Sequence, residues 1–300
     1  MKKIKYTVAF LLLIPLYTFS QLKSFTIDEL LKASDELFIS KGMPKDSGLY
    51  SVGDALYQAG RYDSASIAFS ACIIKNPLYT DAYYYRGLSF MYTKQLDFAL
   101  NDFDVVIKFE PQSEGAYLNK GITCSYKGDY VNSLKCYDKA ITINNQNGWA
   151  YYYRANVKSQ MKYPDNEILK DYDQVIKMKD FDDFSDNQKA LIYNNKAYIL
   201  VQKGLLDEAL KLVNIALKYD KTKWFIWDTR GEIYFKQKKF VECINDMSQA
   251  IEIDESRSDN SFYYRGLAKI KSKIDGCQDL KQAFELGKKA AQSEIAKSCK

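Results

Sequence analysis

Apolar and polar positions follow one another along this 300-residue chain with the spacing of three and four residues that is typical of amphipathic helices. The apolar segments come in pairs separated by short turns, which lie near Ala59-Gly60, Lys127-Gly128 and Lys203-Gly204. Prolines at positions 77 and 111 close the first two units, because proline interrupts a helix. The pattern predicts an all-α protein built from units of helix, short turn and helix.

A small residue that follows an aromatic and basic run marks the period of these units. It falls at Gly53, Gly87, Gly121, Ala155, Ala197, Gly231 and Gly266, at intervals of 34, 34, 34, 42, 34 and 35 residues. Five units carry a second small residue twelve positions later, and then a large apolar residue at Phe69, Phe103, Tyr137, Val213 or Met247. We expect the small residues to let the two helices of a unit approach closely, while the large side chain fills the gap to the next pair.

These units resemble the tetratricopeptide repeat family, whose pattern places aromatic, Leu-Gly, Tyr, Ala, Phe and Pro positions on a period of about 34 residues. The unit at 80–113 matches it at Tyr83, Arg86-Gly87, Phe90, Ala99, Phe103 and Pro111, and the unit at 224–257 at Trp227, Arg230-Gly231, Tyr234, Cys243, Met247 and Ala250. The resemblance covers residues 46–287. It implies a right-handed superhelical solenoid of about seven helix pairs. Capping helices are expected at 21–45 and 288–300, because stacked repeats need capped ends.

Most units depart from the family pattern by carrying Arg or Lys in place of its Leu. The four arginine units place Asp fourteen to seventeen residues later. A bidentate pair between the two helices of a unit would explain this covariation, and it predicts the ion pairs Arg86–Asp102, Arg154–Asp171, Arg230–Asp246 and Arg265–Asp279. The lysine units, at Lys120 and Lys196, have Cys136 and Leu212 in the aspartate position.

Residues 1–20 have the order of a secretory signal peptide, with three lysines, an uncharged apolar run and small residues before a cleavage position after Ser20. An uncleaved membrane anchor is the alternative, but the run is shorter than the about 20 residues that a spanning helix needs. No cysteine follows the cleavage position, so a lipid anchor is not supported there. We therefore expect an exported protein, periplasmic or secreted, without a membrane-spanning segment in its mature chain.

Composition narrows the classes of function. Removing the three lysines of the signal peptide lowers the formal net charge from +5 to +2, which gives no electrostatic basis for binding nucleic acid. The chain has no histidine, so it lacks the usual general base and imidazole metal ligand. We expect no enzyme, no metal and no cofactor.

The acidic stretch 180–189 is read as a loop on one face. A calcium loop is disfavoured because the stretch lacks the glycine and distal glutamate of an EF-hand.

Of the six cysteines, Cys72, Cys124 and Cys243 stand where the repeat needs small or apolar residues. Cys277 and Cys299 flank the turn at Gly287, so a disulfide between them is an open possibility.

The functional expectation comes from the resemblance. In the family the first helices of the units line a concave groove that binds peptides, and the 25 tyrosines of this chain exceed what a core requires. The resemblance assigns the groove to Tyr84, Tyr85, Tyr92, Asn119, Tyr126, Tyr152, Tyr153, Asn156, Asn194 and Asn195. Rings would supply contact area, and amides would bond the peptide backbone. For each tyrosine, packing between adjacent first helices is the alternative.

We therefore expect a non-catalytic scaffold that binds protein or peptide partners; the oligomeric state stays open. One alternative is a component of an envelope machine, for secretion or outer-membrane assembly, that docks through its convex face or an edge. A carbohydrate-binding or hydrolytic protein is less favoured. Glycoside hydrolysis needs two carboxylates about 5–10 Å apart, and the groove residues include none.

Overall fold

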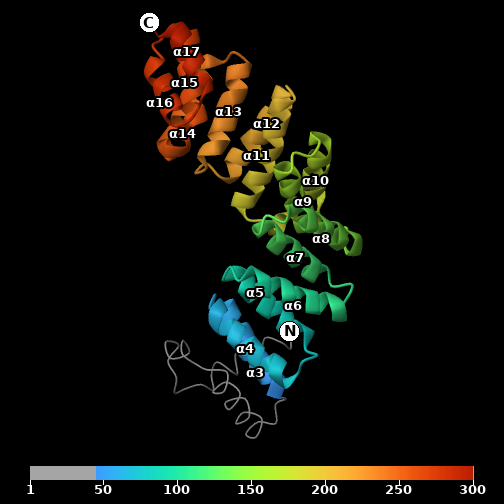
Figure 1. Ribbon diagram of the computed structural model, residues 1–300. Coiled ribbons are helices and arrows are strands. Elements are labelled where there is room, and N and C mark those ends of the chain that lie inside the picture. Colours follow the sequence, from blue (N-terminus) through green and yellow to red (C-terminus); the bar gives the residue numbers. More distant parts are fainter. Residues whose placement is uncertain (1–44, 300) are drawn as a thin grey trace. The chain divides into compact units, whose positions relative to one another are not determined.

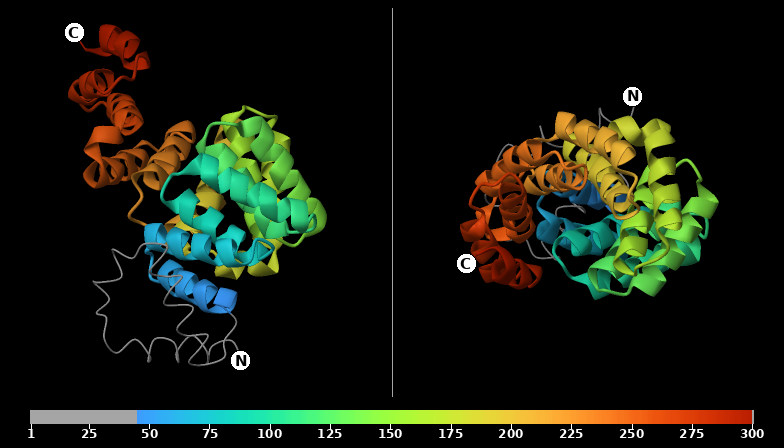
Figure 2. Two further views of the ribbon diagram at one scale, coloured as in Figure 1. Left: turned by 60° about the horizontal axis from the view of Figure 1, so that its bottom comes forward. Right: turned by 90° about the horizontal axis from the view of Figure 1, so that it is seen from above.

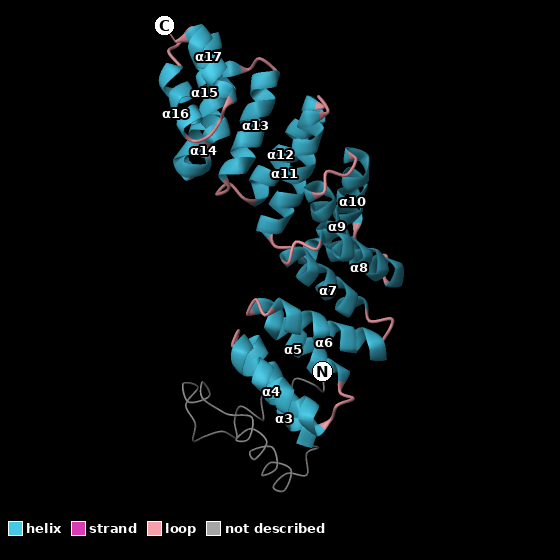
Figure 3. Cartoon of the chain, viewed as in Figure 1, coloured by secondary structure: helices cyan, strands magenta, loops and turns pink. Residues whose placement is uncertain are grey.

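A computed structural model describes residues 45–299, and within them every regular element is a helix (Figure 3). The expected signal peptide at 1–20 lies outside these residues. So does the capping helix expected at 21–45, apart from Lys45, which begins the first described helix. None of the described helices is both long and apolar enough to cross a membrane.

The chain divides into two compact units, and the second begins at Tyr163. The first unit contains α3 (Lys45–Gln58), α4 (Tyr62–Lys75), α5 (Thr80–Tyr92), α6 (Leu96–Phe109), α7 (Glu114–Tyr126), α8 (Tyr130–Ile143) and α9 (Gly148–Gln160). The second contains α10 (Asp165–Lys177), η2 (Lys179–Asp183), α11 (Asp186–Gln202), α12 (Leu206–Tyr219), α13 (Trp224–Lys236), α14 (Phe240–Ile253), η3 (Glu255–Arg257), α15 (Asp259–Lys271), α16 (Cys277–Glu285) and α17 (Ala290–Ser298).

Within each unit, consecutive helices pair as hairpins that stack on one another (Figures 1 and 2). The first unit contains the hairpins α3/α4, α5/α6 and α7/α8, and the second contains α11/α12, α13/α14 and α15/α16, with α17 against α16. The first helices also contact one another in succession, from α3 through α5 and α7 to α9, and from α11 through α13 to α15. The prediction of an all-α fold made of repeated helix pairs is confirmed.

The small residue of each repeat lies where the two helices of a hairpin are closest. A Cβ atom on Gly121 would lie 2.6 Å from Cε1 of Tyr137, and one on Gly231 would lie 2.8 Å from Cε of Met247. Both large side chains are fully buried. The periodic small residue therefore makes room for the periodic large one, which explains why the two recur together.

The turns also repeat. Each hairpin turn contains one residue with a left-handed backbone, at Gly60, Lys94 and Gly128 in the first unit and at Gly204, Lys238 and Lys273 in the second. Glycine adopts this conformation without steric cost, and lysine does not. The three lysine turns therefore keep the hairpin geometry at some cost in stability.

The acidic stretch 180–189 is a packed turn followed by a helix start. Phe181 and Phe184 are buried, and their ring centroids are 5.9 Å apart. Ser185 then forms a capping box with Gln188 at the beginning of α11, which satisfies donors at the helix end. The two phenylalanines explain how a chain segment with several carboxylates stays ordered on the second unit.

Candidate functional site

The sequence YYYRG at 83–87 lies in α5 and places each of its side chains differently. Tyr83 lies under the guanidinium of Arg86, with 5.4 Å between the ring centroid and Cζ. Tyr84 accepts a hydrogen bond of 2.9 Å at its hydroxyl from Nδ2 of Asn119 in α7. Tyr85 packs against the core and is half-buried. A Cβ on Gly87 would lie 3.0 Å from Phe103. The repeated motif thus joins helices both within a hairpin and between hairpins.

Tyrosines of the first helices gather on one face of the first unit. The ring centroid of Tyr85 lies 6.0 Å from that of Tyr50 and 5.4 Å from that of Tyr57, both in α3. Tyr57 also contacts Tyr92, whose ring stacks on Tyr62 at 4.4 Å. We define the tyrosine face as the first-helix residues Tyr50, Tyr57, Tyr84, Tyr85, Tyr92, Tyr126, Tyr152 and Tyr153.

Two members of the tyrosine face are well exposed. Tyr92 is 53% exposed and Tyr126 is 65% exposed, although isolated rings of this size are more often buried. The other six members are half-buried. Six of the tyrosines therefore pack partly between the helices, whereas Tyr92 and Tyr126 are the most accessible to a partner.

The phenols of Tyr84 and Tyr153 remain protonated at neutral pH. Burial raises the pKa of Tyr84 to about 12, with smaller contributions from Tyr85 and Glu114. Burial also raises the pKa of Tyr153 to about 12, and the nearby phenols of Tyr126, Tyr152 and Tyr92 add to the shift. These two tyrosines therefore present neutral hydroxyl groups, which can both donate and accept hydrogen bonds.

Helix α9 contributes a second aromatic group to the same face. The ring of Tyr153 stacks on buried Tyr137 at 6.1 Å and on Trp149 at 6.2 Å. Burial raises the pKa of Tyr152, and its hydrogen bond with Asn156 lowers it. The sequence reasoning did not include Tyr50, Tyr57 or Trp149. The repeat period would have indicated Tyr50, which lies three residues before Gly53 as Tyr84 lies before Gly87.

The two asparagines expected in the groove, Asn194 and Asn195, belong to the second unit, where each has its own surroundings. Asn195 donates from Nδ2 to the hydroxyl of Tyr172 at 3.3 Å. Asn194 is only 5% exposed, and its Oδ1 receives no hydrogen bond from the described residues. The structure thus buries Asn194 in α11 instead of presenting it at a surface. Ala190 and Ala197, which flank it on the same helix, are fully buried.

The second unit has instead a buried polar cluster on its first helices, which sequence reasoning missed. Asp228 of α13 is 9% exposed, and its carboxylate accepts hydrogen bonds from the Ser261 hydroxyl at 2.5 Å and from Nδ2 of Asn260 at 2.8 Å. Burial raises the pKa of Asp228 to about 6, although these two hydrogen bonds lower it. Lys288 donates to Oδ1 of Asn260 at 2.6 Å, which extends the cluster toward the C-terminus.

In three of the repeats, the arginine before the small residue forms a bridge between two second helices. Arg86 makes a bidentate pair with Asp102 at 2.8 and 2.7 Å, and its third nitrogen donates to Ser70 of the preceding hairpin at 3.1 Å. Arg230 does the same with Asp246 and Asn214. Each arginine therefore ties its own second helix to the second helix before it, through partners sixteen residues away in both directions.

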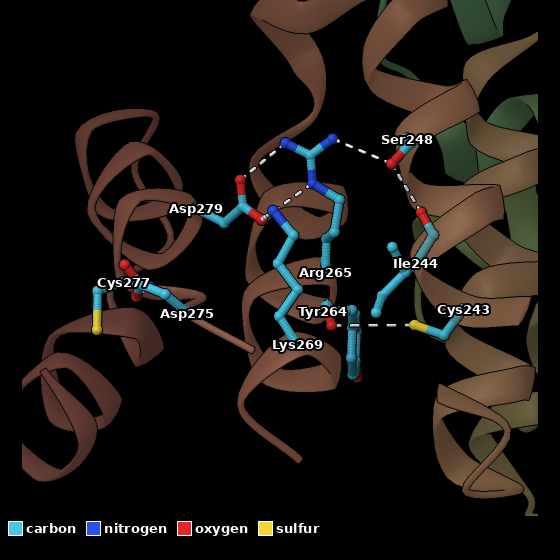
Figure 4. Close-up of polar contacts among 9 residues, drawn as sticks. All are labelled: Cys243, Ile244, Ser248, Tyr264, Arg265, Lys269, Asp275, Cys277 and Asp279. Carbon is cyan, nitrogen blue, oxygen red and sulfur yellow. Dashed lines mark hydrogen bonds and ion pairs between the residues drawn. The ribbon is translucent and has the colours of Figure 1, made fainter. Parts of the chain in front are cut away.

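Figure 4 shows the same bridge at the end of the second unit. Arg265 donates to both oxygens of Asp279 and to the hydroxyl of Ser248, and Lys269 adds a contact of 2.7 Å to Asp279. Burial raises the pKa of Asp279, but the two bases together lower it below its ordinary value. In Asp102 and Asp246, each with a single base, burial prevails and the pKa is raised.

In the remaining repeats, the basic residue pairs with an aspartate that lies earlier in the chain. Arg154 pairs with Asp138 at 2.7 Å, and Lys120 pairs with Asp104. Lys196 pairs with Asp173 in the second unit. The pair expected between Arg154 and Asp171 would join residues of the two units and stays a prediction; Asp171 itself is buried in α10.

Two cysteines form a disulfide, and the other four are buried. Cys277 at the start of α16 is bonded to Cys299, which follows α17, with 5.6 Å between their Cα atoms. Cys72, Cys124, Cys136 and Cys243 are buried thiols. The disulfide holds the last helix against the preceding one, at the end of the second unit.

Comparisons with known proteins agree with this architecture. A family model for the tetratricopeptide repeat matches residues 114–147. A TPR repeat-containing protein of Methanocaldococcus jannaschii is 22% identical over 242 residues, which are 74% of this chain and 40% of that protein. The chain therefore spans less than half the length of this relative.

Solved structures show the same fold. YrrB, described as a TPR protein with an unusual peptide-binding site, has a TM-score of 0.55 at 18% identity, over 70% of this chain and all of that one. The pilF protein of Pseudomonas aeruginosa has a TM-score of 0.61 at 11% identity, over 74% of this chain and 94% of that one. At these identities the likeness concerns the fold alone.

Proposed function

Because the chain is a tetratricopeptide repeat protein, we propose that it is a non-catalytic scaffold that binds an extended peptide segment of a partner on the tyrosine face. Proteins of this family are generally non-catalytic scaffolds that bind protein or peptide partners. The observation that carries the proposal is the exposure of Tyr92 and Tyr126 beside half-buried phenols that are held in place by neighbouring helices.

The contacts support an extended ligand. A partner backbone needs hydrogen-bonding groups, and rings that are already packed lose little entropy when they are covered. Tyr84 is held by Asn119, and Tyr92 is stacked on Tyr62, so both are positioned before any partner arrives. The description of YrrB as a peptide-binding TPR protein is consistent with such a role.

A photo-crosslinking residue at position 92 or 126 tests this proposal. The crosslinker in place of either tyrosine should capture a partner segment, whereas the crosslinker in place of Tyr198 should not. Tyr198 is a suitable control because it is 51% exposed but lies in α11 of the second unit. Equal capture at all three positions would contradict binding at the tyrosine face.

A second candidate is docking through the second helices, as expected of a component of an envelope machine. Phe98 and Phe109 of α6 and Val131 of α8 are 58%, 48% and 56% exposed, and exposed apolar side chains often mark contact surfaces. A crosslinker at position 98 distinguishes the two. Capture at position 98, with none at positions 92 and 126, would favour the second candidate.

We also propose that the protein is exported after cleavage behind Ser20. The signal-like pattern of residues 1–20 supports this. The disulfide between Cys277 and Cys299 is consistent with it, because disulfides persist in oxidising compartments. Mass spectrometry of the protein from the producing cell tests both points. An intact N-terminus, or reduced cysteines in the native protein, would contradict the proposal.

A further inference from the structure

The part of the tyrosine face formed by α3 and α5 carries two carboxylates among its rings. Asp54 lies four residues after Tyr50 and three before Tyr57, so all three share one side of α3. Asp81 lies four residues before Tyr85 on α5 in the same way. The carboxylates of both aspartates raise the pKa of Tyr50 and of Tyr85, after burial as the main cause. Both are therefore close enough to act on these phenols.

The tyrosine rings near these carboxylates are oriented in different directions. The plane of Tyr85 is inclined at 74° to that of Tyr50 and at 77° to that of Tyr57. Rings at such angles present faces and edges in different directions, and the negative face of an aromatic ring attracts a cation within about 6 Å of its centroid. Three tyrosines and two carboxylates are thus arranged where two adjacent first helices meet.

These two carboxylates differ from four other acids of the first unit. Asp97, Asp102, Asp104 and Asp138 each pair with a lysine or an arginine. Asp54 accepts only a long hydrogen bond of 3.3 Å from Gln58, and Asp81 pairs with no base in the described part of the chain. This end of the face therefore carries uncompensated negative charge.

We propose that this end of the tyrosine face binds a lysine or arginine side chain of the partner segment, which lies against Tyr50, Tyr57 and Tyr85 and is neutralised by Asp54 and Asp81. The proposal rests on the function proposed above and adds the chemistry of the ligand. Charge complementarity is its argument: an acidic segment would be repelled, and an uncharged one would leave both carboxylates without a counter-charge.

The experiment selects ligands first and then compares matched probes. Mature full-length protein is used to select peptides from a randomised display library. Each selected sequence is then synthesised with its basic residue intact and with norleucine, which keeps the carbon chain of lysine without the charge. We expect the lysine or arginine form to bind about tenfold more tightly. The double variant Asp54→Asn/Asp81→Asn should reduce this ratio to about one.

Matched variants separate charge from folding. Asp63→Asn removes an exposed carboxylate from α4 of the same hairpin and should keep the tenfold ratio. Tyr57→Leu should lower the ratio, and Tyr57→Phe should restore it, because phenylalanine keeps the ring face. A ratio that survives the double aspartate variant would overturn the assignment of these carboxylates.

The remaining outcomes distinguish the two proposals. If selected peptides bind, lose binding in Tyr92→Ala/Tyr126→Ala, and bind equally well with lysine and norleucine, the cation inference is wrong and the peptide-binding function stands. If the folded protein selects no peptide from the library, both proposals are overturned.

Discussion

Tyr84 of the first unit and Asp228 of the second occupy the same position of the repeat, three residues before the glycines at 87 and 231. Each connects its first helix to the next one, Tyr84 through Asn119 and Asp228 through Asn260 and Ser261. The connection is made by a neutral phenol in one unit and by a buried carboxylate in the other. The same position of the repeat therefore serves the same structural purpose with two different acceptors, a phenol and a carboxylate.

This difference shows which properties belong to the repeat and which to the individual unit. The arginine bridge is shared, since Arg86 and Arg230 have equivalent partners on both sides. The cluster of tyrosines around the exposed Tyr92 and Tyr126 belongs to the first unit, whereas the buried carboxylate of Asp228 belongs to the second. Peptide binding is accordingly proposed for the tyrosine face, and the repeat alone would not justify it.

The largest expected effect concerns the shared bridge. Asp102→Ala and Asp246→Ala should each lower the free energy of unfolding by about 2–3 kcal/mol, because each leaves a partly buried guanidinium without its carboxylate. Thermal and denaturant melting of both variants measures the loss. The comparison predicts similar losses in the two units.

Asp97→Ala is the control for this prediction, since Asp97 is an exposed acid paired with Lys127. Surface pairs contribute little, so its melting curve should match that of the parent. A parent-like curve for Asp102→Ala as well would show that the bridge does not stabilise the unit.

The next largest effect is a pH dependence of stability that arises from Asp228 in the second unit. The pKa of Asp228 is about 6 in the folded protein and ordinarily 3.8, so the folded state binds this proton more tightly than the unfolded chain does. The resulting stabilisation is present at about pH 4 and is lost as the pH rises to about 6. It amounts to about 3 kcal/mol at most. Glu232 and Lys288 are the charged groups near Asp228, and neither changes this sign.

Asp228→Asn should remove this part of the pH dependence, while Tyr84→Phe should leave it intact because the pKa of Tyr84 is about 12. Unfolding free energies of the parent and both variants between pH 4 and 7 provide the measurement. The difference between parent and variant isolates Asp228 from the other carboxyl groups. If Asp228→Asn had the same slope as the parent, the carboxylate would not be titrating in this range.

The helix pairs were predictable because their signals repeat. The small residue, the large residue and the arginine recur with one period, and each has a local physical role that the structure shows at Gly121, Tyr137 and Arg86. The upstream half of the bridge was missed although it was equally periodic. A polar residue stands sixteen positions before Arg86, Lys120 and Arg230, but only downstream aspartates were considered.

The polar cluster of the second unit could not be found in this way. Asp228 looks like any acidic residue of a helix surface. Its burial depends on Asn260 and Ser261, which lie more than 30 residues away and on another helix. Asn194 shows the same difficulty, since the resemblance assigned it to the groove by its position in the repeat, and the structure buries it. Burial of single polar side chains depends on tertiary contacts that have no periodic pattern.

The smallest effect tests the turns that both units share. Lys94 and Lys238 have the same left-handed backbone, with φ of 61° in each, and Gly60 and Gly204 occupy the equivalent position in neighbouring hairpins. Lys94→Gly and Lys238→Gly should each raise the free energy of unfolding by about 0.5–1 kcal/mol, because relief of the strain exceeds the extra chain entropy of glycine. Lys135→Gly, in the exposed interior of α8, should instead lower it by about 1 kcal/mol. Equal gains at positions 94 and 238 would show that the two units share their backbone frame and differ in the side chains they place on it, whereas a gain in one unit alone would place the difference in the turns as well.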